Sequence, residues 1–227
     1  RSDTFYFDPA PTDAEEIDTI TELEDVETDE RIDEGIYDRL DFSALPEDEP
    51  ATVDLSGGLG GFVIAQHSAG GIWHYVEVDD AAYFENIEQV VGGSGDDLIA
   101  GNVAENWFDG GPGNDAMAGG DGDDIYYFAT AVLDSDANPE EDTVSEEVDQ
   151  GSDTFDFSAL EAGDDLVADL TVDFPGAIAT HLNRTVTTVA AGQYAYFENV
   201  IGGAGDDQIT ANSSDNTLTG GAGDDQY

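Results

Sequence analysis

Between Gly92 and Tyr127 the sequence places one bulky apolar residue at every ninth position, each time after a turn rich in glycine and aspartate. The same spacing returns from Gly202 to the end of the sequence. The recurring apolar residues are Ile99, Phe108, Met117, Tyr126, Ile209, Leu218 and Tyr227. A single apolar residue per nonamer cannot form a core by itself. We therefore expect the turns to stack and to bury these residues as a continuous ladder.

Outside the nonamers, alternation of apolar and polar residues predicts short strands at 52–55, 72–78, 166–174 and 185–196. Glycines at 57–61 and 70–71 predict hairpin turns between strands. The acidic stretch 9–38 favours a solvated loop or a short edge segment, and 128–152 an acidic connector. The predicted fold class is all-β with little helix.

The order of motifs occurs twice along the chain. DFSAL stands at 41 and again at 156, YFEN at 83 and 196, and GGxGDD at 92 and 202. We predict two units: residues 1–128, with nonamers at 92–127, and residues 129–227, with nonamers at 202–227 cut off one residue short. Residues 1–8 have the phase of a nonamer end. The sequence is therefore either a piece of a longer array, which we favour, or a subunit whose two ends meet.

Charge narrows the possible functions. The chain has 54 acidic residues and 4 basic ones, for a formal net charge of −50, and it has no cysteine. Such self-repulsion opposes compaction, so bound cations or high ionic strength must offset it. No basic patch can be assembled for nucleic acid, and no apolar run reaches the length of a membrane helix. The 11 Phe and 9 Tyr argue against a wholly disordered acidic chain.

The nonamers GGSGDDLIA, GGPGNDAMA and GGDGDDIYY, with GGAGDDQIT and GGAGDDQY in the second unit, fit G-G-x-G-x-D-x-U-x, where U is bulky and apolar. This pattern resembles the RTX family of calcium-binding repeats. The D-F-S-x-L and F-E-N motifs also resemble the RTX region of secreted bacterial proteins, including the carboxy-terminal part of serralysin-type proteases. The resemblance covers most of the chain. It implies a tandem parallel β-roll with two nonamers per turn, and several Ca²⁺ ions bound between turns two nonamers apart.

Carried over to this sequence, the resemblance implies three calcium sites, formed by the pairs Asp97–Asp115, Asn106–Asp124 and Asp207–Asp225. Because Asn carries no charge, the second site is expected to be weaker than the first. The candidate metal-binding residues are Gly92, Gly93, Ser94, Gly95, Asp97, Asn106, Gly110, Gly111, Pro112, Gly113, Asp115, Gly119, Gly120, Asp121, Gly122, Asp124, Gly202, Gly203, Ala204, Gly205, Asp207, Gly220, Gly221, Ala222, Gly223 and Asp225. The alternative is that these are ordinary tight turns that bind no ion.

We find no catalytic motif. The histidines His67, His74 and His181 lack metal-ligand spacing, and we expect them to be surface or strand residues. No G-x-S-x-G, H-E-x-x-H, P-loop or dinucleotide fingerprint is present, so the chain is predicted not to be an enzyme. Residues 134–138 open like an EF-hand, but Pro139 and Ser145 stand where that loop needs glycine and glutamate. An irregular calcium loop there remains an alternative to an acidic connector.

The predicted function is a calcium-binding structural repeat of a secreted or cell-surface bacterial protein, an adhesin, surface layer or extracellular filament. It would fold on binding Ca²⁺ outside the cell. Its expected partners are calcium ions and neighbouring repeat units or identical subunits placed end to end. The family resemblance implies type I export. The alternative function is an export and folding carrier for a secreted RTX hydrolase, and sequence upstream of Arg1 would separate the two.

Overall fold

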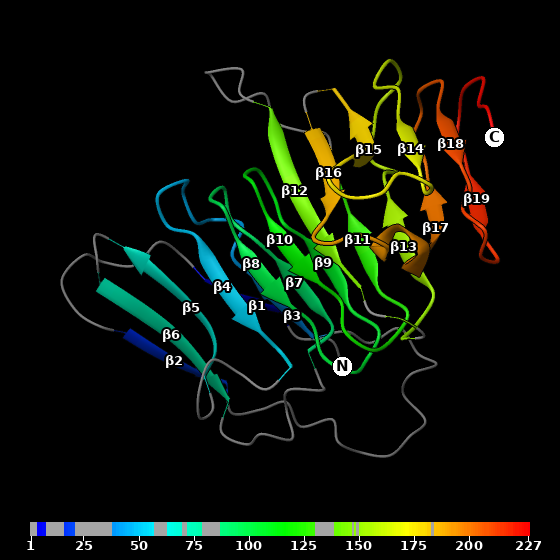
Figure 1. The fold of residues 1–227 in the computed structure, drawn as a ribbon. Helices are drawn as coiled ribbons and strands as arrows, with labels where there is room; N and C mark the ends of the chain where they lie inside the picture. The colour runs from blue at the N-terminus through cyan, green and yellow to red at the C-terminus, as the bar shows by residue number, and fades with distance from the viewer. Residues whose placement is uncertain are drawn as a thin grey trace.

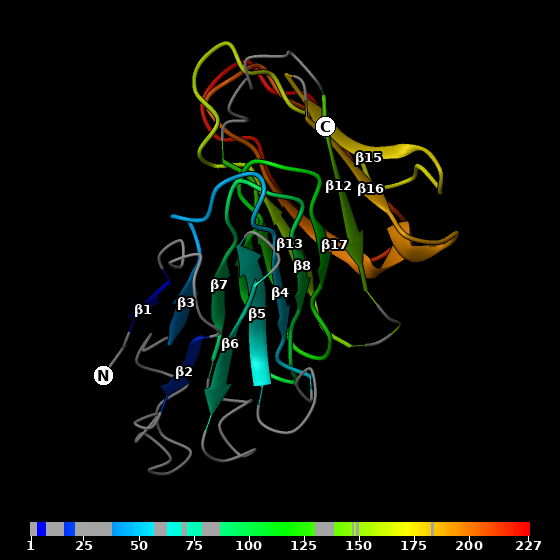
Figure 2. The same cartoon turned by 90° about the vertical axis from the view of Figure 1, so that its left-hand side faces the viewer.

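The computed structural model describes residues 4–7, 16–20, 38–56, 63–69, 72–78, 87–129, 139–146, 148, 150–182 and 184–227. Within these residues the chain forms two β-sheets that face each other across a shared core (Figure 1, Figure 2). One short 3-10 helix, η2 (Gln193–Tyr196), accompanies the strands. The predicted all-β class with little helix is confirmed.

The first sheet has the strand order β1-β3-β7-β9-β11-β13-β17-β19, and all its neighbouring strands are parallel. Its strands are short because each one bridges two turns. They are β1 (Thr4–Tyr6), β3 (Arg39–Asp41), β7 (Gln89–Val91), β9 (Trp107–Asp109), β11 (Ile125–Tyr127), β13 (Asp153–Asp156), β17 (Phe197–Ile201) and β19 (Thr217–Thr219).

The second sheet has the order β18-β14-β15-β16-β12-β10-β8-β4-β5-β6-β2. Its strands are β18 (Gln208–Thr210), β14 (Val167–Asp169), β15 (Ala177–His181), β16 (Arg184–Thr188), β12 (Glu140–Ser145), β10 (Ala116–Ala118), β8 (Leu98–Ala100), β4 (Ala51–Asp54), β5 (Val63–Ala69), β6 (Ile72–Val78) and β2 (Glu16–Ile20). Each unit inserts one antiparallel meander into this sheet, β4-β5-β6 in the first and β14-β15-β16 in the second. The remaining pairs are parallel.

The chain passes from one sheet to the other with every nonamer, so two nonamers complete one coil. Ile99 in β8 therefore pairs with Met117 in β10, and Phe108 in β9 pairs with Tyr126 in β11. This is the predicted parallel β-roll. Both sheets continue past residue 128, because β10 pairs with β12 and β11 pairs with β13. The two sequence units thus share their sheets.

The core between the sheets is the predicted ladder of inward residues. Its members in the nonamers, Ile99, Phe108, Met117, Tyr126 and Ile209, are at most 3% exposed. The coils between the nonamer blocks extend the ladder with buried Leu40, Val53, Val90, Val144, Phe155 and Val200. Tyr227 does not join the ladder as the period predicts. It is 72% exposed on the last coil, and its hydroxyl accepts a hydrogen bond from the Gly220 N–H.

Several elements differ from those expected. In 166–174 only β14 is a strand, and the strand expected at 185–196 ends at Thr188 and is followed by η2. The connector 128–152 contains β12, in which Glu140 and Asp142 take alternate buried positions. A pattern based on hydrophobicity misses β12 because its inward residues are charged. The edge strand β2 agrees with the edge segment expected in 9–38. The predicted hairpin turns at 57–61 and 70–71 and the loop 134–138 lie outside the described residues.

Candidate calcium sites at the corners of the roll

The glycine-rich turns form two columns along the roll. We call the column leading from the first sheet to the second the first corner; it contains turns 92–97, 110–115, 202–207 and 220–225. The column leading back is the second corner and contains turns 101–106, 119–124 and 211–216. Stacking in register places the sixth residues of successive turns above one another, so carboxylates gather at both corners.

At the first corner a ladder of hydrogen bonds links successive coils through aspartate. The Asp97 N–H donates to Asp115 Oδ1 at 2.8 Å, and the Asp115 N–H donates to Asp142 Oδ1 at 3.0 Å. In the second unit the Asp207 N–H donates to Asp225 Oδ1 at 3.2 Å. The structure therefore brings together the predicted pairs Asp97–Asp115 and Asp207–Asp225.

The second corner repeats this arrangement. The Asn106 N–H donates to Asp124 Oδ1 at 2.7 Å, and the Asp124 N–H donates to Asp153 Oδ1 at 3.0 Å. The Asp153 N–H in turn donates to Glu198 Oε2 at 3.0 Å. The predicted pair Asn106–Asp124 is thus in register too, but its column continues through two acidic residues that lie outside the nonamers.

Glycine lets backbone oxygens approach these carboxylates. A Cβ on Gly92 would lie 2.3 Å from both Asp97 Oδ2 and the Gly110 carbonyl oxygen. Gly111 has a φ of +89°, and a Cβ there would lie 2.2 Å from the Gly93 carbonyl oxygen. Carbonyl and carboxylate oxygens therefore line the inside of each turn at distances that no side chain tolerates.

The other candidate residues take three positions in these turns. Gly119, Gly202 and Gly220 stand first, like Gly92 and Gly110, and a Cβ on each would lie within 2.4 Å of a side-chain oxygen; the same holds for Gly101, which was not among the predicted residues. Gly120, Gly122, Gly221 and Gly223 have positive φ and face carbonyl oxygens of the preceding coil, while Gly93, Gly95, Gly113, Gly203 and Gly205 complete the Gly-Gly-x-Gly runs. The third-position residues are half-buried (Ser94, Pro112, Ala204) or exposed (Asp121, Ala222).

Burial disfavours the ionised form of these carboxylates unless a cation is bound nearby. It raises the pKa of Asp97 to about 6, of Asp115 to about 8 and of Asp124 to about 7, and neighbouring carboxylates add to each rise. The buried oxygens Asp115 Oδ2 and Asp124 Oδ2 have no hydrogen-bond partner. A buried, unpartnered carboxylate oxygen is costly, so both atoms fit ligands of a bound cation.

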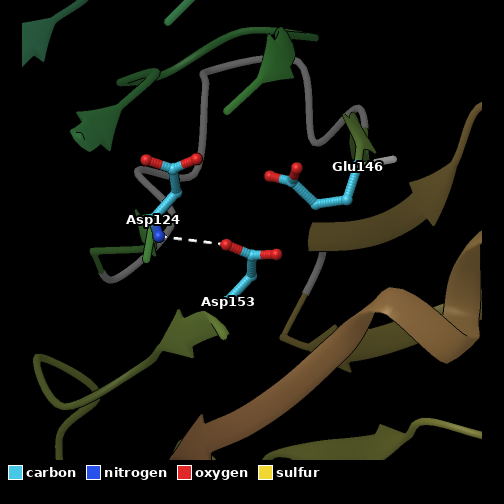
Figure 3. A group of neighbouring side chains, drawn as sticks. All are labelled: Asp124, Glu146 and Asp153. Atoms are coloured by element: carbon cyan, nitrogen blue, oxygen red, sulfur yellow. Dashed lines mark hydrogen bonds between the residues drawn. The ribbon is translucent and has the colours of Figure 1, made fainter. Parts of the chain in front are cut away.

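The densest group of acidic side chains lies at the second corner. One carboxylate oxygen each from Asp124, Glu146 and Asp153 lies within 4.8 Å of the others, and all three residues are buried. Figure 3 shows the three carboxyl groups turned toward one space. Glu146 also accepts a hydrogen bond from the Tyr126 hydroxyl, while its Oε2 has no partner. Burial raises the pKa of Glu146 to about 8 and of Asp153 to about 7.

Sequence reasoning missed Asp142 and Glu146, which lie in the presumed acidic connector 128–152, and Asp153, which directly follows it. A signal was available for two of them. Asp153-Thr154-Phe155 has the same pattern as Asp124-Ile125-Tyr126, and its strand pairs in register with that of Tyr126. Asp142 likewise precedes Val144 by two residues, as Asp115 precedes Met117. No pattern in the sequence marks Glu146.

The degenerate second nonamers have their own hydrogen bonds. The Asn102 and Asn106 side chains donate to the Ile87 carbonyl at 3.0 and 3.4 Å. In the second unit the Asn212 side chain donates to the Phe197 carbonyl at 2.8 Å. In both units, asparagine side chains of the degenerate turn therefore bind backbone carbonyls of the preceding coil. These turns connect to the preceding coil by hydrogen bonds from asparagine, where a regular nonamer has glycine and aspartate.

All three histidines lie in strands. His67 in β5 and His181 in β15 are buried rather than on the surface, and His74 is part of β6. Burial lowers the pKa of His181 to about 4, so this ring is neutral at pH 7. Among the described residues, the only group of three potential metal ligands is the Asp124–Glu146–Asp153 cluster, which offers oxygen alone.

Buried, unpartnered carboxylate oxygens beside close backbone carbonyls suit a hard divalent cation with many oxygen ligands, and calcium fits better than zinc. The fold and the repeats define a calcium-binding parallel β-roll of the RTX type. The profile for the RTX calcium-binding nonapeptide repeat (4 copies) matches residues 195–227. The profile for the peptidase M10 serralysin C-terminal domain matches residues 31–184, so the chain belongs to that family.

A search of curated proteins gives no significant match. Domains of the RTX and serralysin C-terminal kinds are typical of secreted proteins. Among the described residues, no helix is long and apolar enough to cross a membrane.

Proposed function

We propose that this chain is a structural repeat of a secreted or cell-surface protein, and that calcium binding at its corners holds its coils together. The proposal assigns one calcium site to the Asp97–Asp115 pair, one to the Asp124–Glu146–Asp153 cluster and one to the Asp207–Asp225 pair. The observation that carries it is the Asp124–Glu146–Asp153 cluster, where three buried carboxylates converge and two of their oxygens lack any partner.

The mechanism couples binding to folding. When ionised and calcium-free, the stacked carboxylates at each corner repel one another and hold the coils apart. Bound calcium supplies the positive charge that neutralises them. The turns then close on the carboxylates, the strands pair in register, and the apolar ladder between the sheets is buried. The ladder alone gives each nonamer one buried side chain, which is why the chain depends on its corners.

Calorimetric calcium titration with far-ultraviolet circular dichroism, starting from chelated protein in moderate salt, tests the calcium mechanism. We expect a transition from coil to β-structure with several ions bound, and no such transition with magnesium. A chain that is already folded in chelator and binds no calcium would refute the site assignments. It would then be a roll held by its apolar ladder alone.

An extended array, such as an adhesin stalk, surface layer or filament, is the larger role we propose. The edges of the first sheet support it. By sequence phase, edge strand β19 corresponds to β9 and edge strand β1 corresponds to β11, and β9 and β11 are parallel neighbours inside the roll. A further unit or a second copy can therefore continue the sheet with the pairing already used inside it.

Electron microscopy of concentrated protein in calcium tests the array. End-to-end polymers, or rods whose length grows with the number of chains fused in tandem, are the expected result. Compact particles that neither polymerise nor lengthen in tandem would refute it and favour the alternative role as carrier of an adjoining secreted enzyme.

A further inference from the structure

Arg184 is a buried cation in a chain that has almost none. It is the first residue of β16, it is 4% exposed, and it is one of 4 basic residues against 54 acidic ones. Its guanidinium lies over two acidic residues of the parallel strand β12. The Arg184 Nη2 lies 2.7 Å from Glu140 Oε2, and its Nε lies 3.2 Å from Asp142 Oδ2.

The same guanidinium reaches the turn of the preceding coil. Arg184 Nη2 donates to the Gly111 carbonyl oxygen at 2.8 Å. Gly111 is the second residue of its nonamer, and the equivalent carbonyl one coil earlier, that of Gly93, faces the Gly-Gly turn of the next coil, at Gly111 itself. The next coil at this corner, which leads into β12, has no Gly-Gly turn in its sequence. The arginine side chain occupies that place.

The column of aspartates nevertheless continues past this point. Asp142 accepts the Asp115 N–H just as Asp115 accepts the Asp97 N–H one coil earlier. The Asp115–Asp142 layer therefore has the paired carboxylates of a calcium site and, in addition, a covalently attached positive charge. A guanidinium suits this place, because its planar donors can serve two carboxylates and a carbonyl at once and it stays charged at every physiological pH.

The opposite corner of the same coil provides an internal comparison. There Asp124, Glu146 and Asp153 converge, and none of the ion pairs found in the described part of the chain involves them. One coil thus has a corner with a built-in cation and a corner with carboxylates only. Burial raises the pKa of Asp142, and the positive charge of Arg184 opposes this rise.

We propose that the Arg184 guanidinium is a built-in substitute for calcium at the Asp115–Asp142 layer, so that this corner closes without metal while the Asp124–Glu146–Asp153 corner requires it. The inference rests on the proposed calcium-dependent function. The coil that joins the two units is then anchored at one corner before any calcium binds. Calcium binding then closes the other corner of this coil and the remaining turns of the roll.

The first unit carries a different residue at the equivalent position. There His74 pairs with Glu16 in the register in which Arg184 pairs with Glu140. Histidine, unlike arginine, carries no permanent charge. Of these two equivalent positions, only the one at the junction between the units holds an arginine.

A variant pair tests the proposal by counting ions. Arg184→Ala removes the guanidinium, and Arg39→Ala is the matched control, because Arg39 also pairs with an aspartate (2.9 Å to Asp41) and its loss changes the net charge equally. Calorimetry at saturating calcium should find one more ion per chain in Arg184→Ala than in the parent. Its folding midpoint should move to at least about tenfold higher free calcium. Arg39→Ala should bind the parental number. An unchanged number of ions in Arg184→Ala would overturn the proposal.

Hydrogen exchange on the unaltered chain tests the same idea if Arg184→Ala does not fold. The amides of Asp115 and Thr143 report on the corner that holds Arg184 (the arginine corner), since they donate to Asp142 Oδ1 and to the Asp115 carbonyl. The amides of Asp124 and Thr154 report on the corner formed by Asp124, Glu146 and Asp153 (the carboxylate corner), because they donate to Asp153 Oδ1 and to the Asp124 carbonyl.

As free calcium is lowered, the carboxylate-corner amides should lose protection at higher calcium than the arginine-corner amides. Simultaneous loss, or the reverse order, would overturn the built-in cation. Protection that does not change with calcium at either corner would instead refute the calcium mechanism itself, so the two failures are distinguishable.

Discussion

Comparing Gly111→Ala with a control substitution should show whether Gly111 is needed for calcium binding at the first corner or only for the conformation of its turn. Gly111 has a φ of +89°, and an added Cβ would lie 2.2 Å from the Gly93 carbonyl oxygen. Gly163 is the matched control. It has a φ of +101°, and a Cβ there would meet nothing within 4 Å. Both substitutions force alanine into a left-handed conformation, but only the first drives two stacked coils apart.

The expected magnitudes differ clearly. Left-handed alanine costs about 1–2 kcal/mol, which is the full effect expected for Gly163→Ala. At position 111 the coils must also separate by about an ångström, because a close-packed interior cannot absorb so short a contact. The Asp97 N–H to Asp115 Oδ1 bond of 2.8 Å is then lost, costing about 1 kcal/mol. Loss of one calcium site at a concentration of about 100 times its Kd adds about 2.7 kcal/mol. Gly111→Ala should therefore cost about 5 kcal/mol.

Urea denaturation at saturating calcium measures both variants, and calorimetry counts their bound ions. Gly163→Ala should keep the parental number of ions, and Gly111→Ala should lose one. If Gly111→Ala costs no more than Gly163→Ala and keeps every ion, the oxygens of turns 92–97 and 110–115 do not form a calcium site.

Three further predictions concern the second corner and the core. Asp124→Asn should weaken calcium binding by at least about tenfold, since one charged ligand of the cluster is lost; Glu161→Gln, an exposed change outside both corner columns, should leave the titration unchanged, and equal effects would argue against the cluster. Phe155→Ala should cost about 3–5 kcal/mol of unfolding free energy because Phe155 is fully buried in the ladder, whereas Phe174→Ala, 47% exposed, should cost under about 1 kcal/mol in the same urea assay. In chelator a larger fraction of the chain should be folded at pH 5 than at pH 8 by far-ultraviolet circular dichroism, because burial raises the pKa of Glu146 to about 8 from 4.5. A raised folded-state pKa stabilises fully below the unfolded value and loses its effect as pH rises through the folded one; greater stability at pH 8 would contradict this.

The nine-residue period made the roll predictable because it encodes both a turn and one inward side chain. The pairing of Ile99 with Met117 and of Phe108 with Tyr126 follows directly from it. The same period placed Tyr227 in the ladder, whereas the structure leaves its side chain 72% exposed, with its hydroxyl bonded to the Gly220 N–H. The period alone does not determine whether the residue that carries it is buried.

Strand β12 and the residues around it were not predictable in the same way. Its inward Glu140 and Asp142 look like solvated acids, but Arg184, more than 40 residues away in sequence, neutralises both of them, and the Asp115 N–H donates to Asp142. Glu146 is buried through a comparable long-range contact with the Tyr126 hydroxyl. The sequence revealed local turn chemistry, whereas these charges depend on which coils lie next to each other.

The sharing of both sheets across residue 128 has a mechanical consequence. Strands lie across the stack, so the hydrogen bonds between coils point along its length, as they do between β11 and β13. Tension along the stack therefore loads these bonds end to end, and coils peel away one after another instead of shearing together. Because β11 and β13 pair directly, a pull on one unit passes to the other through these hydrogen bonds. In the proposed mechanism, cations bound at the corners raise the force needed to separate each coil.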